Sequence, residues 1–279
     1  MEKTVEPKVV LITGASSGIG LDAAIRFCKM GYKVYGAARR IDMFKQIEGL
    51  GGHRIFLDLT QDESIQRCVS HVLAQEGRID ILVNNAGYGL GGPLETISIE
   101  EAKKQFEVNL FGLARITQLV LPSMRQNKYG RIINVSSIAG KFSSPFLGWY
   151  HATKYSVEAY SDALRMEVAP FGIKVSIIEP GMIQTDWGTI AEQNVKKFSE
   201  NSPYEDNGKR VSKYYHLNYV EKKASDPSIV GDAIIKAGTS RRPKIRYKIG
   251  KYARLFTFIT KHSCDCFTDF VIRKVYGIK

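Results

Sequence analysis

Tyr150 and Lys154 lie four residues apart, and Ser137 precedes Tyr150 by 13 residues. On a helix, a step of four places two side chains on one face, so a phenol and an ammonium would share one small volume. A neighbouring positive charge lowers the pKa of a tyrosine, which suits a general acid for a carbonyl or a base for an alcohol. Together with the glycine-rich turn described next, these residues indicate a hydride-transfer enzyme.

A glycine-rich turn follows the first apolar run of the chain and leads into an amphipathic helical pattern. Glycines let the backbone approach a pyrophosphate, and the first N–H groups of a helix are free to bind its charge. The position of the turn, after a strand and before a helix, favours a dinucleotide site. The residues of this turn that we expect to bind the cofactor are Gly14, Ser16, Ser17, Gly18, Ile19 and Gly20.

Arg39 and Arg40 stand at the end of the second expected strand, where dinucleotide sites usually carry a carboxylate. A carboxylate would repel the additional phosphate of NADP, whereas a guanidinium can bind it through two parallel hydrogen bonds. We therefore expect NADP(H) rather than NAD(H), with Arg39 in direct contact and Ser17 adding a hydroxyl. The alternative is that both arginines point into solvent.

Apolar, β-branched runs alternate with helical patterns along most of the chain. This alternation predicts an α/β fold, a doubly wound Rossmann-type three-layer sandwich of about seven parallel strands flanked by helices. The expected strands are residues 8–13, 33–38, 54–57, 81–84, 131–135, 174–178 and 244–249. The expected helices are residues 18–30, 63–76, 99–126, 148–169 and 227–237. Ligands should bind at the carboxyl ends of the strands.

The chain of 279 residues is expected to hold a single Rossmann-type catalytic domain over residues 1–250. Residues 186–225 are polar and rich in lysine, and they predict a substrate lid with short helices. Residues 251–279 form a basic and apolar C-terminal extension, which we expect to pack on or near the substrate cleft.

Charge is concentrated in the C-terminal part of the chain. The net charge is +12, and residues 241–279 contain 11 Lys or Arg and 2 Asp or Glu, a net charge of +9. Such a segment beside the apolar run from Leu255 to Ile259 suits peripheral contact with an anionic membrane surface, or an acidic ligand. The alternative is a solvated basic face beside a helix that covers the substrate cleft. No nucleic-acid-binding motif accompanies the charge.

The remaining composition favours a folded cytoplasmic protein. Hydrophobic residues make up 44% and charged residues 24%, and no apolar run reaches the length of about 18 residues that a membrane span needs. Residues 1–7 lack the hydrophobic stretch of a signal peptide. Cys28, Cys68, Cys264 and Cys266 have no paired spacing with histidines, so we expect reduced thiols and no metal site.

Ordered motifs now identify the chain as similar to the short-chain dehydrogenases/reductases. The resemblance covers about residues 8–249. It is carried by TGASSGIG at 13–20, NNAG at 84–87, Asn109, NVSS ending at Ser137, YHATK at 150–154 and the pair Pro180-Gly181. Within the family, the chain looks most like the 17β-hydroxysteroid and retinol dehydrogenase group.

The resemblance implies a catalytic set of Asn109, Ser137, Tyr150 and Lys154. Tyr150 would give a proton to the substrate oxygen, and Ser137 would hydrogen-bond the same oxygen. Lys154 would lower the pKa of Tyr150 and bind the nicotinamide ribose. Asn109 would hold a water that passes protons to Lys154.

The resemblance also implies cofactor contacts at the ends of other strands. Asp58 would hydrogen-bond the adenine amino group, or alternatively would only cap the turn that follows it. Asn84, Ala86 and Gly87 would lie beneath the adenosine ribose and steady the sheet, or alternatively Asn84 and Asn85 would be ordinary loop amides. The Ile183 backbone would meet the nicotinamide carboxamide. The further residues expected at the cofactor are Leu59, Asn85, Ala86, Gly87, Tyr150, Lys154, Pro180, Gly181 and Thr185.

The sequence therefore predicts an NADP(H)-dependent oxidoreductase of a hydrophobic carbonyl compound or secondary alcohol, such as a steroid, a retinoid or a lipid-like ketone. The expected apolar wall of the substrate site comprises Tyr88, Leu90, Phe142, Phe146, Leu147, Trp149, Met182 and Trp187. The alternative function is a non-catalytic NADPH sensor whose basic tail docks on a membrane or a partner. By resemblance the helices that carry Asn109 and Tyr150 would form a homodimer or homotetramer, unless the extension after Gly250 covers that surface.

Overall fold

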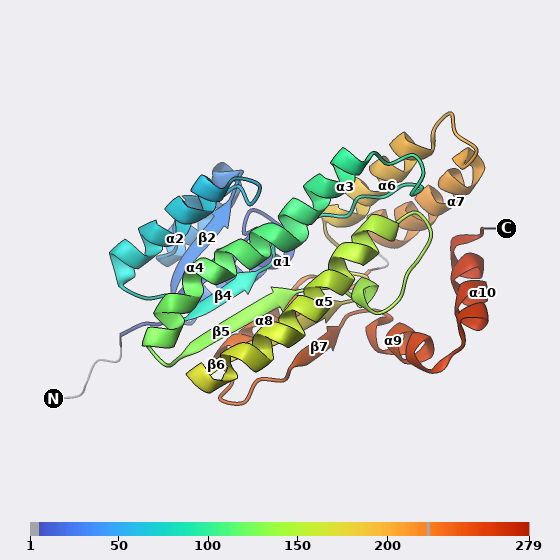
Figure 1. Cartoon of the computed structure of the whole chain (residues 1–279). Coiled ribbons are helices and arrows are strands. Elements are labelled where there is room, and N and C mark those ends of the chain that lie inside the picture. Colours follow the sequence, from blue (N-terminus) through green and yellow to red (C-terminus); the bar gives the residue numbers. More distant parts are fainter. Residues whose placement is uncertain (1–5, 222–223, 279) are drawn as a thin grey trace.

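A seven-stranded parallel sheet forms the centre of the molecule in the computed structural model, which describes residues 6–221 and 224–278. The strands run in the spatial order β3-β2-β1-β4-β5-β6-β7 (Figure 1). Their bounds are β1 Val9–Thr13, β2 Lys33–Ala38, β3 His53–Phe56, β4 Ile81–Asn84, β5 Gly130–Val135, β6 Ile173–Pro180 and β7 Arg246–Ile249. The doubly wound fold is confirmed, and the order reverses between β1 and β4, where such sheets bind ligands.

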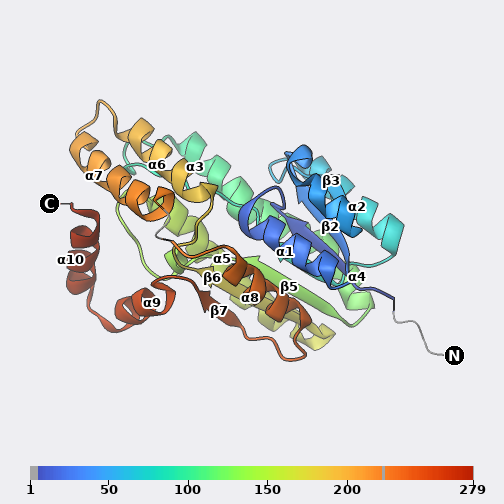
Figure 2. The ribbon, with the colours of Figure 1, turned by 180° about the vertical axis from the view of Figure 1, so that it is seen from behind.

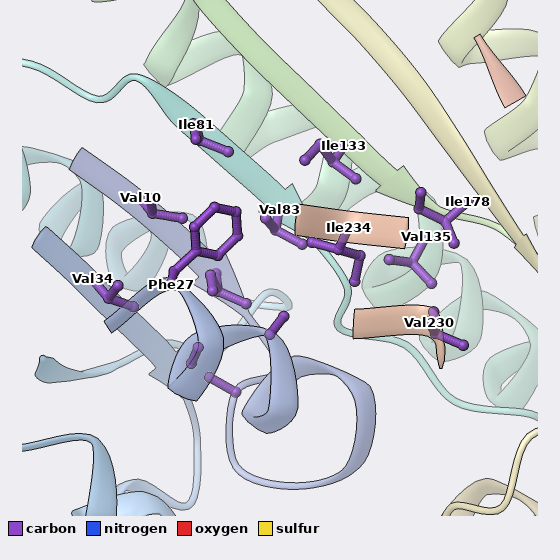
Figure 3. Close-up of a cluster of buried hydrophobic side chains, with 14 of the residues drawn as sticks. Val10, Phe27, Val34, Ile81, Val83, Ile133, Val135, Ile178, Val230 and Ile234 are labelled. Carbon is purple, nitrogen blue, oxygen red and sulfur yellow. The ribbon is translucent and has the colours of Figure 1, made fainter. Parts of the chain in front are cut away.

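Helices cover both faces of the sheet, because strands such as β1 bury every side chain and need apolar cover on each side. One face carries α1 (Gly18–Lys29) and α8 (Ser228–Thr239), as the view from behind shows (Figure 2). The opposite face carries α2 (Asp62–Glu76), α4 (Gly112–Gln126) and α5 (Gly148–Val168). In the first of these layers, Phe27 and Ile234 reach down onto the valines and isoleucines of the strands (Figure 3).

The helix expected over residues 99–126 is interrupted. It consists of α3 (Ile99–Phe106), a π-helical segment over Glu107–Phe111, and α4. Asn109 lies in the π-helical segment and is buried. π-Helical turns inside α-helices are frequent at functional sites, because they displace one residue from the regular helical face.

The segment expected to be a lid folds as two helices beyond the carboxyl ends of the strands. They are α6 (Asp186–Ser199) and α7 (Glu205–Tyr215), followed by a π-helical turn over His216–Val220. The C-terminal extension forms α9 (Ala253–His262) and α10 (Asp265–Tyr276). α10 stands next to α7 at the end of the molecule away from α2 (Figures 1 and 2). Tyr276 packs with Tyr215 and Val211 of α7, so the extension is part of the same apolar cluster as the lid.

The cysteines and the other potential metal ligands of the described residues are dispersed. Cys28 and Cys68 are buried, whereas Cys264 and Cys266 are exposed, and all four are free thiols. Within residues 6–221 and 224–278 no group of three or more His, Cys, Asp or Glu could hold a metal ion. No helix in these ranges is both long and apolar enough to cross a membrane.

Candidate active site

The glycine-rich turn connects β1 to α1 in a conformation that side chains would block. Gly14 and Gly18 have φ of +67° and +54°, and a Cβ at Gly20 would collide with the carbonyl oxygen of Gly14. Ser17 is the residue before the first turn of α1, and its hydroxyl accepts no capping hydrogen bond from the helix. The first turn contains no acidic residue, so its N–H groups can meet an anion. Ser16 and Ile19 lie in the same turn, half-buried, and the cradle as a whole fits a dinucleotide pyrophosphate.

The loop after β4 is tied to this turn by hydrogen bonds. The backbone N–H groups of Asn85 and Ala86 donate to Thr13 Oγ1 at 3.0 and 3.1 Å. The Asn85 side-chain amide donates to the carbonyl oxygens of Thr13 and Gly14 at 3.1 and 3.2 Å. Asn85 and Ala86 therefore lie at the expected cofactor groove, and they hold its two sides together.

Asn84 has the sheet-steadying role that the resemblance implied. Its side-chain amide donates to Asn134 Oδ1 at 2.9 Å and to Thr117 Oγ1 at 3.0 Å. These bonds join β4 to β5 and to α4. The Asn84 side chain is buried, so it supports the groove from inside the sheet.

Arg39 and Arg40 lie at the end of β2, next to the glycine turn, because Gly14 N donates to Ala37 O at 2.8 Å. Both arginines are exposed, and no hydrogen bond or ion pair to another described residue occupies either guanidinium. Burial raises the pKa of Tyr88, and the positive charge of Arg39 opposes that rise. Arg39 therefore lies close enough to Tyr88 for its charge to act on the phenol.

Asp58 caps the turn after β3, which was the alternative reading of this residue. Its Oδ1 accepts hydrogen bonds from Thr60 N at 3.0 Å and from Thr60 Oγ1 at 2.8 Å. Leu59 is buried, and it packs so closely on Gly112 that a Cβ there would lie 2.6 Å from Leu59 Cβ. Both residues sit at the carboxyl end of the sheet, where an adenine contact remains a prediction.

Ser137, Tyr150 and Lys154 come together at the carboxyl end of β5. Ser137 begins the short 3₁₀ turn Ile138–Gly140, and its Oγ accepts from Ala139 N at 3.1 Å. Tyr150 and Lys154 lie one helical turn apart on α5, 8% and 6% exposed. The Ser137 hydroxyl hydrogen-bonds the Tyr150 phenol. The Lys154 ammonium lies 5.7 Å from the centroid of the Tyr150 ring and donates to Val135 O at 2.9 Å.

The pKa values of this pair correct one expectation from the sequence. Burial raises the pKa of Tyr150 to about 12, against the hydrogen bond from Ser137, which lowers it. Burial lowers the pKa of Lys154 to about 8, against the charge of Glu158, which raises it. The prediction that the pKa of Tyr150 lies below its ordinary value is therefore wrong for the protein alone, because burial outweighs any neighbouring positive charge. Packing removes water from both groups, and loss of hydration disfavours the charged form of each.

Both polar atoms of the Asn109 side-chain amide form hydrogen bonds within the protein. Its Oδ1 accepts from Tyr88 N at 3.0 Å, and its Nδ2 donates to Tyr88 O at 3.0 Å and to Thr153 Oγ1 at 3.1 Å. Gly87 lies between Asn109 and Lys154, because a Cβ there would lie 3.1 Å from Asn109 Oδ1 and 3.8 Å from Lys154 Nζ. Asn109 thus joins the groove loop to α5, and its water-holding role stays a prediction.

The segment after β6 forms the remaining side of the groove. Pro180 O lies 3.4 Å from Ser137 Oγ, and Gly181 N donates to Ile249 O at 2.8 Å. Ile183 pairs with Ser225 as an isolated bridge. Thr185 begins α6 and touches the glycine turn, since a Cβ at Gly18 would lie 3.2 Å from its Cγ2. The structure therefore brings both ends of the expected cofactor set to one edge of the sheet.

A cavity of about 70 Å³ lies over Ser137 and Tyr150. Four of the expected wall residues line it, namely Phe142, Leu147, Met182 and Trp187, while Tyr88, Leu90, Phe146 and Trp149 do not. Most of the wall residues that sequence reasoning missed come from the lid and the extension: Tyr214, Tyr215, Tyr219, Tyr252, Phe256, Ile272, Val275 and Tyr276. The others, Ile138, Ala139, Ser144 and His151, lie close to Ser137 and Tyr150 in the sequence. About 10–15 Å³ of such space holds one water, so this cavity holds only a few waters, and a bulky substrate needs the walls to move apart.

Aromatic rings form the roof over Tyr150. The Trp187 ring lies 5.1 Å from the Tyr150 ring and 5.5 Å from the Tyr219 ring, between centroids. The Tyr214 and Tyr276 rings are 4.5 Å apart. Their clustering in the lid gives no signal in the sequence beyond the count of tyrosines, because only the packing of α7 against α10 turns them toward α5.

Residues 8–196 match the sequence profile of the family described as short chain dehydrogenase. A 3-ketodihydrosphingosine reductase of Bacteroides thetaiotaomicron is 36% identical over 98% of this chain and the whole of that protein. Human retinol dehydrogenase 8 is 31% identical, over 92% of this chain and 86% of that protein. The likeness to retinol dehydrogenases expected from the sequence is confirmed.

Solved structures show the same likeness. A short-chain dehydrogenase from Streptomyces avermitilis is 32% identical and superimposes with a TM-score of 0.79, over 98% of each chain. The closed form of a serine dehydrogenase complexed with NADP+ is 30% identical with a TM-score of 0.72, over 87% of this chain and 94% of that one.

Proposed function

The chain belongs to the short-chain dehydrogenase family, and we propose that it is an NADP(H)-dependent oxidoreductase of a hydrophobic carbonyl compound or secondary alcohol. Oxidoreduction between CH–OH and C=O groups with a nicotinamide cofactor is common to the family members it matches. The observation that carries the proposal is the meeting of the half-buried Ser137 with the buried Tyr150 and Lys154 under an aromatic roof, beside a glycine turn that fits a pyrophosphate.

Tyr150 is the proton donor in this proposal. Because burial raises its pKa to about 12, the phenol is protonated at neutral pH and can donate to a carbonyl oxygen. Ser137 hydrogen-bonds the same oxygen and holds it against the phenol. Lys154 binds ribose hydroxyls through its ammonium, and Asn109 links the groove to the proton path. Bound NADP(H) supplies or accepts the hydride.

The proposed cofactor contacts follow the groove from one end to the other. The guanidiniums of Arg39 and Arg40, at the end of β2, pair with no other residue in the described part of the chain, which supports binding of a phosphate on the adenosine ribose. The similar serine dehydrogenase was solved in complex with NADP+, which also supports NADP(H) as the cofactor. Pro180, Gly181, Ile183 and Thr185 would hold the nicotinamide end.

The substrate is proposed to be a steroid, a retinoid or a lipid-like ketone. The walls of the cavity are almost entirely aromatic or aliphatic, with Ser137, Ser144 and His151 as the polar exceptions besides the tyrosine hydroxyls. Such walls favour an apolar molecule whose oxygen meets a few polar groups. Two relatives are named for hydrophobic substrates, 3-ketodihydrosphingosine and retinol.

The Tyr150→Phe variant tests the enzyme against the alternative of a non-catalytic NADPH sensor. We expect turnover of a hydrophobic ketone to fall by at least about 100-fold, because the proton donor is lost. NADPH affinity, measured by fluorescence titration, should change little. Tyr155→Phe, on an exposed part of the same helix, is the matched control. Turnover that survives in Tyr150→Phe, or that is absent from the wild type with every ketone in a hydrophobic panel, would favour the sensor.

The Arg39→Ala variant tests the cofactor preference. A charge-assisted hydrogen bond is worth about 1.5–3 kcal/mol, so the preference for NADPH over NADH in kcat/KM should fall by about 10- to 100-fold. Arg40→Ala shows whether the second guanidinium shares the contact, and Arg67→Ala, on an exposed site of α2, is the control. An unchanged preference in Arg39→Ala and Arg40→Ala would show that the arginines do not recognise the phosphate.

A further inference from the structure

The two C-terminal helices carry apolar side chains on two opposite faces. The inner face belongs to the cavity: Phe256 packs on Phe142 with ring centroids 5.6 Å apart, and Ile272 is buried. The outer face carries the large apolar side chains Leu255, Phe258, Phe267 and Phe270, which are 54%, 65%, 51% and 61% exposed. Among the described residues, the fold covers the inner face and leaves the apolar side chains of the outer face exposed.

The exposed side chains fall into two groups with helical spacing. Leu255 and Phe258 are three residues apart in α9, and Phe267 and Phe270 are three residues apart in α10. A step of three places two side chains on one face of a helix. Each helix therefore presents an outward pair of large apolar groups, in contrast to isolated exposed residues, which are common on protein surfaces.

Cations accompany these apolar groups. Arg254, Lys261, Arg273 and Lys274 are exposed on the same two helices, and none forms an ion pair with a described residue. The Lys274 ammonium lies 5.9 Å from the centroid of the Phe270 ring. Beside α9, an open depression of about 530 Å³ is lined by Lys248, Tyr252, Arg254 and Leu255, among others. Aromatic and basic side chains together suit the boundary between lipid headgroups and acyl chains.

We propose that the outer face of α9 and α10 docks on the surface of a bilayer that contains anionic lipid. Leu255, Phe258, Phe267 and Phe270 enter the interface between headgroups and acyl chains, and the surrounding cations meet the negative headgroups. A second copy of this chain is a poorer occupant, since it would bring the same positive surface against this one.

Docking also places the cavity beside lipid. Val275 and Tyr276 line the cavity on α10, and Phe256 lines it on α9. The helices that would touch the membrane are therefore the ones that must move apart to admit a bulky substrate. This consequence rests on the proposed function, whereas the docking itself does not.

Sedimentation with vesicles tests the docking without any turnover. Full-length protein is mixed with vesicles of phosphatidylcholine alone or with about one third phosphatidylglycerol, at low and at physiological salt. We expect binding to the anionic vesicles, weaker at the higher salt, and little binding to the neutral ones. The double variant Phe258→Ser/Phe270→Ser should bind at least tenfold more weakly, with unchanged kcat/KM for a small water-soluble ketone.

The matched control is Phe56→Ser/Met166→Ser. It removes two side chains of similar exposure: Phe56, 52% exposed, from β3 at the far edge of the sheet, and Met166, 63% exposed, from α5. The docking proposal fails if anionic vesicles do not bind the wild type, if neutral vesicles bind it equally, or if the control pair loses as much binding. It also fails if light scattering shows a wild-type dimer that Phe258→Ser/Phe270→Ser dissociates. Loss of turnover in Tyr150→Phe leaves this result unaffected, so the two proposals fail separately.

Discussion

Lys154 shows how packing and charge oppose each other at a single residue. The helix that brings its ammonium to Tyr150 also removes it from water, and burial lowers its pKa to about 8. Two features favour the charged form: the hydrogen bond to Val135 O, and the carboxylate of Glu158 one helical turn further along α5. An anionic cofactor at the groove would favour the charged form further, so binding and protonation of Lys154 should be linked.

The Lys154→Met variant tests this burial through the pH dependence of stability. Between pH 8 and pH 10.5 the unfolded chain keeps the Lys154 proton while the folded protein has lost it, so raising the pH through this range favours folding. Relative to the variant, the wild type should gain on the order of 3 kcal/mol over the range. Urea unfolding of the cofactor-free protein measures the gain, with Lys29→Met at an exposed site as the control. Parallel curves for wild type and Lys154→Met would contradict a lowered pKa.

At the scale of elements, the π-helical segment between α3 and α4 shows what local patterns miss. The apolar spacing continues across residues 99–126 without a break, and it predicts one helix. In the structure, the Asn109 amide holds both the N–H and the carbonyl oxygen of Tyr88, and also Thr153 of α5. These bonds join segments far apart in sequence, and they accompany a local change of helix that no neighbouring residue signals.

Helix α10 leads to a prediction about substrate size. The Tyr276 ring lines the cavity, and its hydroxyl lies 3.5 Å from Ser144 Oγ. Removing the ring in Tyr276→Ala should enlarge the cavity. The ratio of kcat/KM for a bulky ketone to kcat/KM for a small ketone should then rise at least about threefold, which corresponds to less than about 1 kcal/mol. Phe267→Ala, on the outer face of the same helix, should leave the ratio unchanged without lipid. An unchanged ratio in Tyr276→Ala would show that α10 does not bound the site.

At the scale of the whole molecule, the cavity is assembled from five stretches of the chain that are widely separated in sequence. They lie within residues 137–151, 181–187, 214–219, 252–256 and 272–276. Tyr276 and Ile278 of the extension pack against the apolar cluster of the lid. The division into a catalytic domain over 1–250 and an extension therefore stays a prediction about folding units. The homodimer or homotetramer also stays a prediction.

The sequence alone determined the sheet, the glycine turn and the meeting of Tyr150 with Lys154. Each depends on a rule that acts over a few residues: apolar β-branched runs form buried strands, glycine permits positive φ, and a four-residue step shares a helix face. The carboxyl ends of parallel strands then gather at one edge, so residues from β1, β5 and β6 come together without further information.

Only the tertiary structure decided the ionisation of that pair and the walls of the cavity. The pKa of Tyr150 rises because α6, α7 and the π-helical turn after α7 bring Trp187, Tyr215 and Tyr219 over α5 and exclude water. Burial depends on which distant segments cover a residue, and the spacing of side chains along one helix does not predict which segments these are. For this reason the residues at the centre of the site were predictable, while their electrostatics and most of their apolar surroundings were not.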